Sequence, residues 1–279
     1  MGCLLPLSLG QVLPSGRSVM RHFVVAPVAA AIHGQETPMR RSPFLAVPPL
    51  VLLLLARFPA PASAHRDDYI DETFVYMTLA RNEFELELWG EGRSSEDRAS
   101  SYWYTSAFEY GITSRWTIDG AGQWTQDRDP LRFGRLRLET RCRFSEEGRL
   151  PVDLAASAEY EREHPGSTGD YEQTLTPRIV VSRDLMRRFN TTLNLDFPIA
   201  LPDGDHVSFA WALGARYPDE GFARYGVELK QHASEHQAVA FPQIWFALPR
   251  EMTLKFGVGI GLTPQTDPVV ARAVFEAEF

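Results

Sequence analysis

A strict alternation of apolar with small or polar residues runs through the chain from residue 83 to its end. The stretch 252–262 is typical: its even-numbered residues are apolar from Met252 to Leu262, and its odd-numbered residues are threonine, lysine or glycine. A period of two places successive side chains on opposite faces of a β-strand. No stretch of a dozen residues keeps a helical period, so the sequence predicts an all-β fold from residue 83 onward.

Turn-forming residues divide this region into twelve predicted strands. Most are about 9–11 residues long, which is the length that a tilted strand needs to cross a membrane. Parallel neighbours would need crossover helices, so we expect an antiparallel sheet. The predicted strands lie near 83–91, 102–110, 115–124, 131–144, 152–162, 171–181, 188–198, 206–216, 222–231, 238–247, 252–262 and 268–279.

A secretory signal peptide is predicted at 39–64. It begins with Met39 and two arginines, continues through an apolar run too short to cross a bilayer, and ends on Ala62-Ser63-Ala64. Residues 1–38 are interpreted as a mis-called start or a disordered extension. Residues 65–82 could form a thirteenth strand, but an odd count would put the two chain ends on opposite sides of a membrane. We therefore expect a periplasmic or lumenal segment there.

Composition excludes several classes of function. The net charge of −8 argues against nucleic acid as a partner, since phosphate binding needs a positive surface. Two cysteines are too few for a disulfide framework or a cysteine zinc site. No phosphate-binding loop, haem motif or catalytic triad order is present, so we expect no cofactor, no metal, no catalytic residue and no enzyme.

The last nine residues, from Ala271 to Phe279, are apolar at every second position and end on phenylalanine. This ending resembles the closing strand of bacterial outer-membrane β-barrels, and the resemblance covers 83–279. It implies a closed antiparallel transmembrane barrel of about twelve strands, with outer-membrane lipid around it. It also implies that Phe279 is a signal read by the barrel-assembly machinery. A soluble β-sandwich would show the same period, but strand length, even strand count, signal peptide and terminal aromatic residue together favour the barrel.

Arginines gather on the inward face of the fourth predicted strand, at Arg135, Arg137, Arg141 and Arg143. A positive stripe in a narrow lumen selects anions. The alternative is a structural ladder: one hairpin register would place Arg143 opposite Asp153, Arg137 opposite Glu159 and Arg135 opposite Glu161. Both interpretations remain open at this level.

A second charged group is acidic. Glu83, Glu85 and Glu87 on the first strand should meet Glu276 and its neighbour Glu278 on the last strand where the barrel closes. Such carboxylates repel one another unless Arg272, Arg216 or a cation offsets them.

The leading functional hypothesis is a porin-like channel or transporter for a small-molecule solute. One alternative is a non-conducting structural or interaction barrel whose charge ladders fill the lumen. A further alternative is a lipid hydrolase, because His206 and Ser208 share a strand face, as in outer-membrane lipid A deacylases.

Overall fold

The computed structural model describes residues 68–94, 100–127, 130–164, 171–186, 188–201, 207–218 and 220–279. The predicted extension 1–38 and signal peptide 39–64 lie outside the described residues. Among the residues described, no helix is long and apolar enough to cross a membrane.

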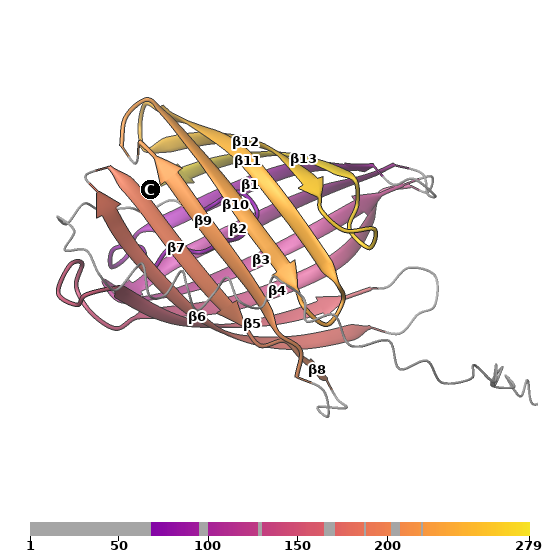
Figure 1. The fold of residues 1–279 in the computed structure, drawn as a ribbon, viewed down its shortest axis with the longest axis horizontal. Coiled ribbons are helices and arrows are strands. Elements are labelled where there is room, and N and C mark those ends of the chain that lie inside the picture. The colour runs from indigo at the N-terminus through magenta and orange to yellow at the C-terminus, as the bar shows by residue number, and fades with distance from the viewer. Residues whose placement is uncertain are drawn as a thin grey trace, which may run out of the picture. The chain divides into compact units, whose positions relative to one another are not determined.

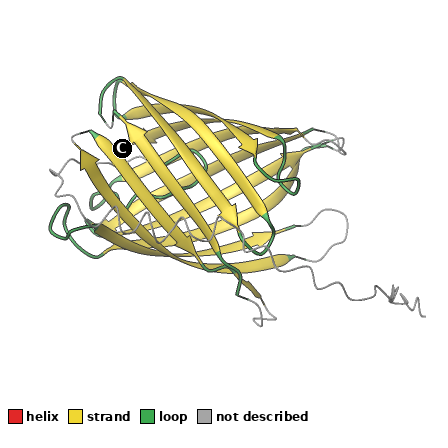
Figure 2. Ribbon diagram, viewed as in Figure 1, coloured by secondary structure: helices red, strands yellow, loops and turns green. Residues whose placement is uncertain are grey.

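The described chain forms a single β-sheet of thirteen strands. Figure 1 shows the strands wound as a tilted ring, and Figure 2 shows that strands make up its wall. The strands are β1 Phe84–Ser94, β2 Ser101–Thr113, β3 Trp116–Gln126, β4 Arg132–Arg143, β5 Asp153–Glu163, β6 Glu172–Met186, β7 Phe189–Asp196, β8 Ile199–Leu201, β9 Ala210–Tyr217, β10 Ala223–His232, β11 Gln237–Leu248, β12 Met252–Gly261 and β13 Val269–Glu278.

The sheet closes on itself. Each strand pairs antiparallel with its neighbours, β5 pairs with β6, and β1 pairs with β13. The short β8 pairs only with β6, beyond the end of β7, and is not part of the ring. At the seam, the Phe84 amide donates to the Phe279 carbonyl at 3.1 Å, and the Phe279 amide donates to the Phe84 carbonyl at 2.8 Å. The predicted closed antiparallel barrel of twelve strands is confirmed.

Alternation gives the wall two chemically different faces. Leu88, Phe108, Leu138 and Val258 point outward from four different strands and are exposed. Inward-facing neighbours include buried charged residues, as Glu139 beside Leu138 illustrates. An apolar exterior around a polar interior is the arrangement that a membrane-spanning barrel requires, because lipid cannot solvate charge.

The register of the β4–β5 hairpin differs from the predicted one by two residues. Arg135 faces Glu163, Arg137 faces Glu161 and Arg143 faces Ala155. The predicted direct pairs, Arg143 with Asp153, Arg137 with Glu159 and Arg135 with Glu161, are therefore wrong. The turn sets the register: the Phe144 amide donates to the Leu154 carbonyl at 2.9 Å, and Asp153 Oδ1 accepts from the Gly148 amide at 2.9 Å. A slip of two residues leaves every side chain on its own face, so alternation could not detect it.

Candidate functional site

Residues 68–82, here called the lumenal segment, form no strand and lie inside the barrel. They contact Arg141 on β4, Asn194 on β7, Glu228 on β10 and Arg272 on β13. These strands lie on different sides of the ring (Figure 1). A segment that reaches all of them can only pass through the lumen.

A tight turn gives the segment its shape. The Tyr69 amide donates to the Thr73 carbonyl at 3.1 Å, and the Glu72 amide donates to the Tyr69 carbonyl at 3.2 Å. Glu72 has a φ of 64°, a left-handed conformation that a non-glycine residue adopts only when its surroundings hold it there. The turn leaves the amides of Ile70 and Asp71 free to bond to the wall.

The wall supplies acceptors for these amides. Glu228, which is 0% exposed, accepts the Asp71 amide at 2.7 Å and the Thr73 hydroxyl at 2.6 Å. The Gln243 amide group donates to Glu228 at 2.6 Å, and its Oε1 accepts the Ile70 amide at 2.8 Å. This network orients both Glu228 and Gln243 toward the turn and leaves few of its polar groups without a partner.

Asn194 on β7 binds the next part of the lumenal segment, at Phe74. Its Oδ1 accepts the Phe74 amide at 2.7 Å, and its Nδ2 donates to the Phe74 carbonyl at 2.8 Å. One side chain thus satisfies both backbone groups of one residue, as a neighbouring strand would. The backbone polar groups of the segment would otherwise be buried without partners.

Ion pairs reinforce the contact between the segment and the wall. Asp68 binds Arg141 at 2.8 Å, and Asp71 binds Arg272 at 3.1 Å. Glu72 forms an ion pair with Arg137. The segment is therefore acidic where the wall is basic.

The chain has two lysines, and both bind the segment. Lys230 donates to the Asp71 carbonyl at 2.8 Å, and Lys255 donates to the Asp68 carbonyl at 2.8 Å. A lysine ammonium has no acceptor capacity, so it needs an oxygen partner when buried. Here the backbone of the segment provides that oxygen.

Burial by itself would raise the pKa of Glu72, because it penalises the charged form. The positive charge of Arg137, with smaller contributions from Lys230 and Arg272, overcomes this effect and lowers the pKa well below its usual range. Glu72 is therefore ionised at neutral pH and keeps its pair with Arg137.

Glycines in the wall make room for the segment. A Cβ at Gly214 would lie 2.7 Å from the Tyr69 ring, and a Cβ at Gly111 would lie 1.9 Å from the Ala80 carbonyl oxygen. Both distances are below any normal contact for a side-chain carbon. The segment can approach the wall this closely at Gly214 and Gly111 only because glycine has no side chain.

The predicted arginine stripe divides into two parts. Arg137 and Arg141 bind the lumenal segment, and Arg137 also lies 3.4 Å from Asp119. The other two arginines bind neighbouring parts of the wall: Arg135 lies 3.2 Å from both Glu161 and Glu163, and Arg143 lies 3.2 Å from Glu146. The charge ladder with Asp153 and Glu159 does not form as predicted, since Asp153 caps the turn.

Asp68, Asp71 and Glu72 were not predicted as partners of the arginines. The sequence did contain one indication of these pairs: residues 65–82 are rich in acidic side chains, and the predicted fourth strand is rich in arginine. No local pattern connects them, because the paired residues are 65 to 201 positions apart along the chain.

Carboxylates line the other side of the lumen. Glu85 faces Glu278 on β13 and Glu109 on β2, while Glu87 faces Glu276. Lys255 forms an ion pair with Glu276. Arg272, one of the cations considered able to offset this group, binds Glu91 and Asp71. Arg216 lies over the rings of Tyr69 and Trp245.

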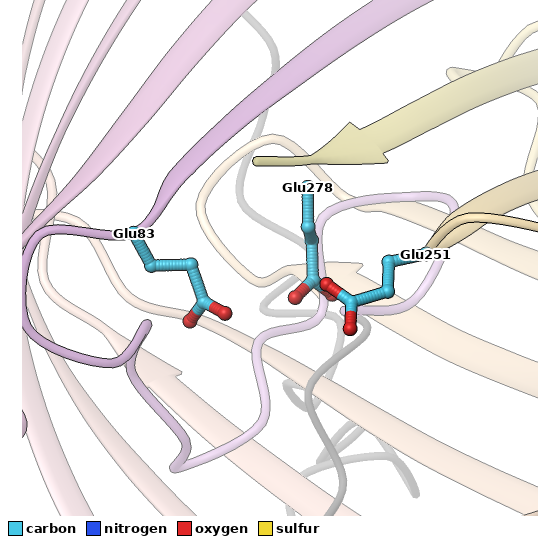
Figure 3. A group of neighbouring side chains, drawn as sticks. All are labelled: Glu83, Glu251 and Glu278. Carbon is cyan, nitrogen blue, oxygen red and sulfur yellow. The ribbon is translucent and has the colours of Figure 1, made fainter.

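Among the residues that the structure describes, two sets of carboxylates have oxygens close enough to share a cation. In each set the ligand atoms lie within 4.8 Å of one another. One set is Glu85, Glu87 and Glu276 in the lumen wall. The other is Glu83, Glu251 and Glu278 at the end of the barrel where the chain terminates, and Figure 3 shows its three carboxylates converging. Oxygen-only sets of this kind suit hard cations.

The hydrolase alternative gains no support from the described residues. His206 lies outside them. The Ser208 hydroxyl donates to the Pro198 carbonyl at 3.3 Å, which orients it toward the backbone and not toward a general base.

No protein-family model matches the chain, and no curated protein matches its sequence. Solved structures do match. The COG4313 outer membrane channel from Pseudomonas putida F1 aligns with a TM-score of 0.54 at 12% identity, over 77% of this chain and 100% of that one. The KdgM porin in complex with disordered oligogalacturonate aligns with a TM-score of 0.53 at 7% identity, over 70% and 99%.

The NanC porin aligns with a TM-score of 0.51 at 9% identity, over 68% of this chain and 97% of that one. At such identities the likeness extends to the fold and not to a solute or a mechanism. The alternation, the apolar exterior, the closed ring and these matches agree: the chain has the fold of bacterial outer-membrane β-barrels similar to the small porins and channels, with no subfamily fixed.

Proposed function

We propose that the protein is an outer-membrane channel for small hydrophilic solutes, and that the lumenal segment closes it. The observation that carries the proposal is that the wall encloses room for a peptide segment. In small barrels, side chains from the strands fill the interior completely. Here residues 68–82 occupy space that the strands leave open.

The barrel does not depend on the segment for its closure. Every pairing in the ring joins one strand to another, and the segment takes part in none of them. Its displacement would therefore leave the hydrogen-bonded ladder of the wall intact. The polar groups released on both sides could then bind water, at a net cost of about 0.5–1.5 kcal/mol for each hydrogen bond.

The fold matches support a channel as the general class. The three matching structures are one outer-membrane channel and two porins. The oligogalacturonate in the KdgM complex belongs to that protein, and we assign no particular solute to this chain.

A non-conducting barrel is the second candidate, and one observation favours it. Tyr69, Ile70, Val75 and Tyr76 are at most 2% exposed, so the segment buries apolar surface as well as polar groups. Burial of each large apolar side chain contributes about 1.5–3 kcal/mol. A segment held this firmly would act as a permanent filling.

Conductance separates the two candidates. The test compares the full chain with the variant Asp68→Asn/Asp71→Asn/Glu72→Gln in planar bilayers and in liposome-swelling assays with small sugars. The channel proposal expects higher conductance and faster swelling in the variant, with heat-modifiable gel migration unchanged.

The control is Glu161→Gln/Glu163→Gln, which removes lumenal charge away from the segment. No conductance from either the full chain or a correctly folded variant would reject the channel and support the non-conducting barrel.

A further inference from the structure

The lumenal segment compensates more charge on the basic side of the lumen wall than on the acidic side. It binds Arg137, Arg141, Arg272 and Lys230 through its own acidic residues. Four cations of the wall are thereby paired with the segment. Among the described residues, Glu85 and Glu87 on β1 form no ion pair with the segment.

Glu85 is the buried carboxylate at the centre of this group. It is 9% exposed, and among the described residues no side chain donates a hydrogen bond to its carboxylate or pairs with it as an ion. Both of its cross-strand neighbours, Glu278 and Glu109, are also acidic. A buried carboxylate without a partner is unfavourable, so this position calls for a positive ligand.

The oxygens around Glu85 are arranged for such a ligand. Those of Glu85, Glu87 and Glu276 lie within 4.8 Å of one another. The Trp89 indole donates to Glu87 Oε2 at 3.0 Å, which orients one of the three carboxylates. Lys255 pairs with Glu276 and also donates to the Asp68 carbonyl, so one ammonium serves the carboxylate group and the segment together.

We propose that Glu85, Glu87 and Glu276 bind a small cation in the lumen wall, and that this site makes the channel prefer cations to anions. The selectivity part rests on the proposed channel function, whereas the binding part does not. The proposal reverses the anion preference suggested by the arginine stripe, because the arginines of that stripe are already paired. Carboxylates that line a pore favour the passage of cations over anions.

Ion selectivity tests the first part with the full chain. The reversal potential is measured in a KCl gradient for the wild type, Glu85→Gln and Glu161→Gln. The two variants remove the same charge, but Glu161 is paired with Arg135. We expect a preference for K⁺ in the wild type, a several-fold loss of this preference in Glu85→Gln, and little change in Glu161→Gln. An anion preference in the wild type, or equal effects of the two variants, overturns the selectivity.

Terbium luminescence tests the binding site without requiring conduction. Tb³⁺ is an oxygen-seeking probe, and Trp89 is close enough to the site to sensitise its emission. Tb³⁺ added to the detergent-solubilised protein should give sensitised emission that is strongly reduced in Glu85→Gln. The emission should persist in Glu251→Gln, which removes a member of the other carboxylate set.

The two measurements separate the possible failures. Emission that is the same in the wild type and Glu85→Gln overturns the cation site, and a proton shared among the carboxylates would then be the better explanation. If the protein shows no conductance in bilayers but its terbium emission depends on Glu85, the channel function and the selectivity are rejected. The cation-binding site is then still supported. Heat-modifiable migration of each variant confirms that the barrel is folded.

Discussion

Arg141 on β4 holds Asp68 with both of its terminal nitrogens, Nη1 to Oδ1 at 3.2 Å and Nη2 to Oδ2 at 2.8 Å. The same guanidinium donates from Nη1 to the carbonyls of Val75 and Met77 at 3.4 and 3.3 Å. One wall residue thus joins two parts of the lumenal segment. A bidentate pair of this kind fixes geometry as well as contributing energy.

We expect Arg141→Gln to loosen the lumenal segment and increase channel opening. Breaking one side of a buried ion pair costs about 3–5 kcal/mol, because the remaining charge has no partner. Single-channel recording measures the open fraction directly. Arg135→Gln is the matched control, because Arg135 binds Glu161 and Glu163 instead of the segment. If the open fraction of Arg141→Gln equals that of the wild type, the pair of Arg141 with Asp68 does not keep the lumenal segment in its closed position.

Gly111→Ala should push the segment away from β2. The new methyl group would lie 1.9 Å from the Ala80 carbonyl oxygen, so the segment must move or the strand must bend. Overpacking of this kind costs about 1–3 kcal/mol. A Cβ at Gly90 would meet no atom within 4 Å, so Gly90→Ala is the control. The measurement is conductance; equal conductance in both variants would contradict a tight fit at Gly111.

Disulfide formation can verify the β4–β5 register. Leu138 and Tyr160 are direct partners, whereas the register expected from the charge ladder would pair Leu136 with Tyr160. Directly opposed residues have Cα atoms about 4.5–5.5 Å apart, within the range for a disulfide. In a Cys142→Ser background, we expect Leu138→Cys/Tyr160→Cys to form a disulfide readily on mild oxidation. Faster oxidation of the pair Leu136→Cys/Tyr160→Cys would support the other register.

Acid should weaken the hold of Glu72 on Arg137 only at low pH. The folded-state pKa of Glu72 is lowered, so its contribution to stability is present above the unfolded-state pKa and is lost as the pH falls toward the folded value. The stability difference between the wild type and Glu72→Gln should therefore be constant from neutral pH down to about 5 and shrink below the usual range of a glutamate. Urea unfolding at a series of pH values measures this difference. A difference that is already lost near pH 6 would contradict the lowered pKa.

Phe279→Ala should affect assembly in the cell more than the folded barrel. The seam bonds of Phe279 come from its backbone, and its side chain is 75% exposed, so little packing is lost. If the barrel-assembly machinery reads the side chain, less protein should reach the outer membrane while refolding in detergent stays near wild-type yield. Membrane fractionation and refolding measure the two quantities. Equal losses in both would assign the side chain a structural role.

Alternation along the chain was enough to predict the twelve strands of the ring and the two faces of each strand. Alternation shows which residues share a face, because a strand repeats every two residues whatever it pairs with. Arg137 and Glu85 therefore belong to the polar face before any pairing is known. The closing strand was also readable, since Val269–Glu278 alternates to its end and is followed by Phe279.

The strand register and the partner of each lumenal charge depend instead on contacts between residues far apart in the chain. Alternation is unchanged by a slip of two residues, so the β4–β5 register depended on how Asp153 caps its turn. The partners of Arg137 and Arg141 were decided by the passage of residues 68–82 through the lumen. That segment has no repeating pattern, and its bonds to the wall reach residues as distant as Arg272. Contacts of this kind exist only once the ring has closed around the segment, because they depend on the space that the folded wall encloses.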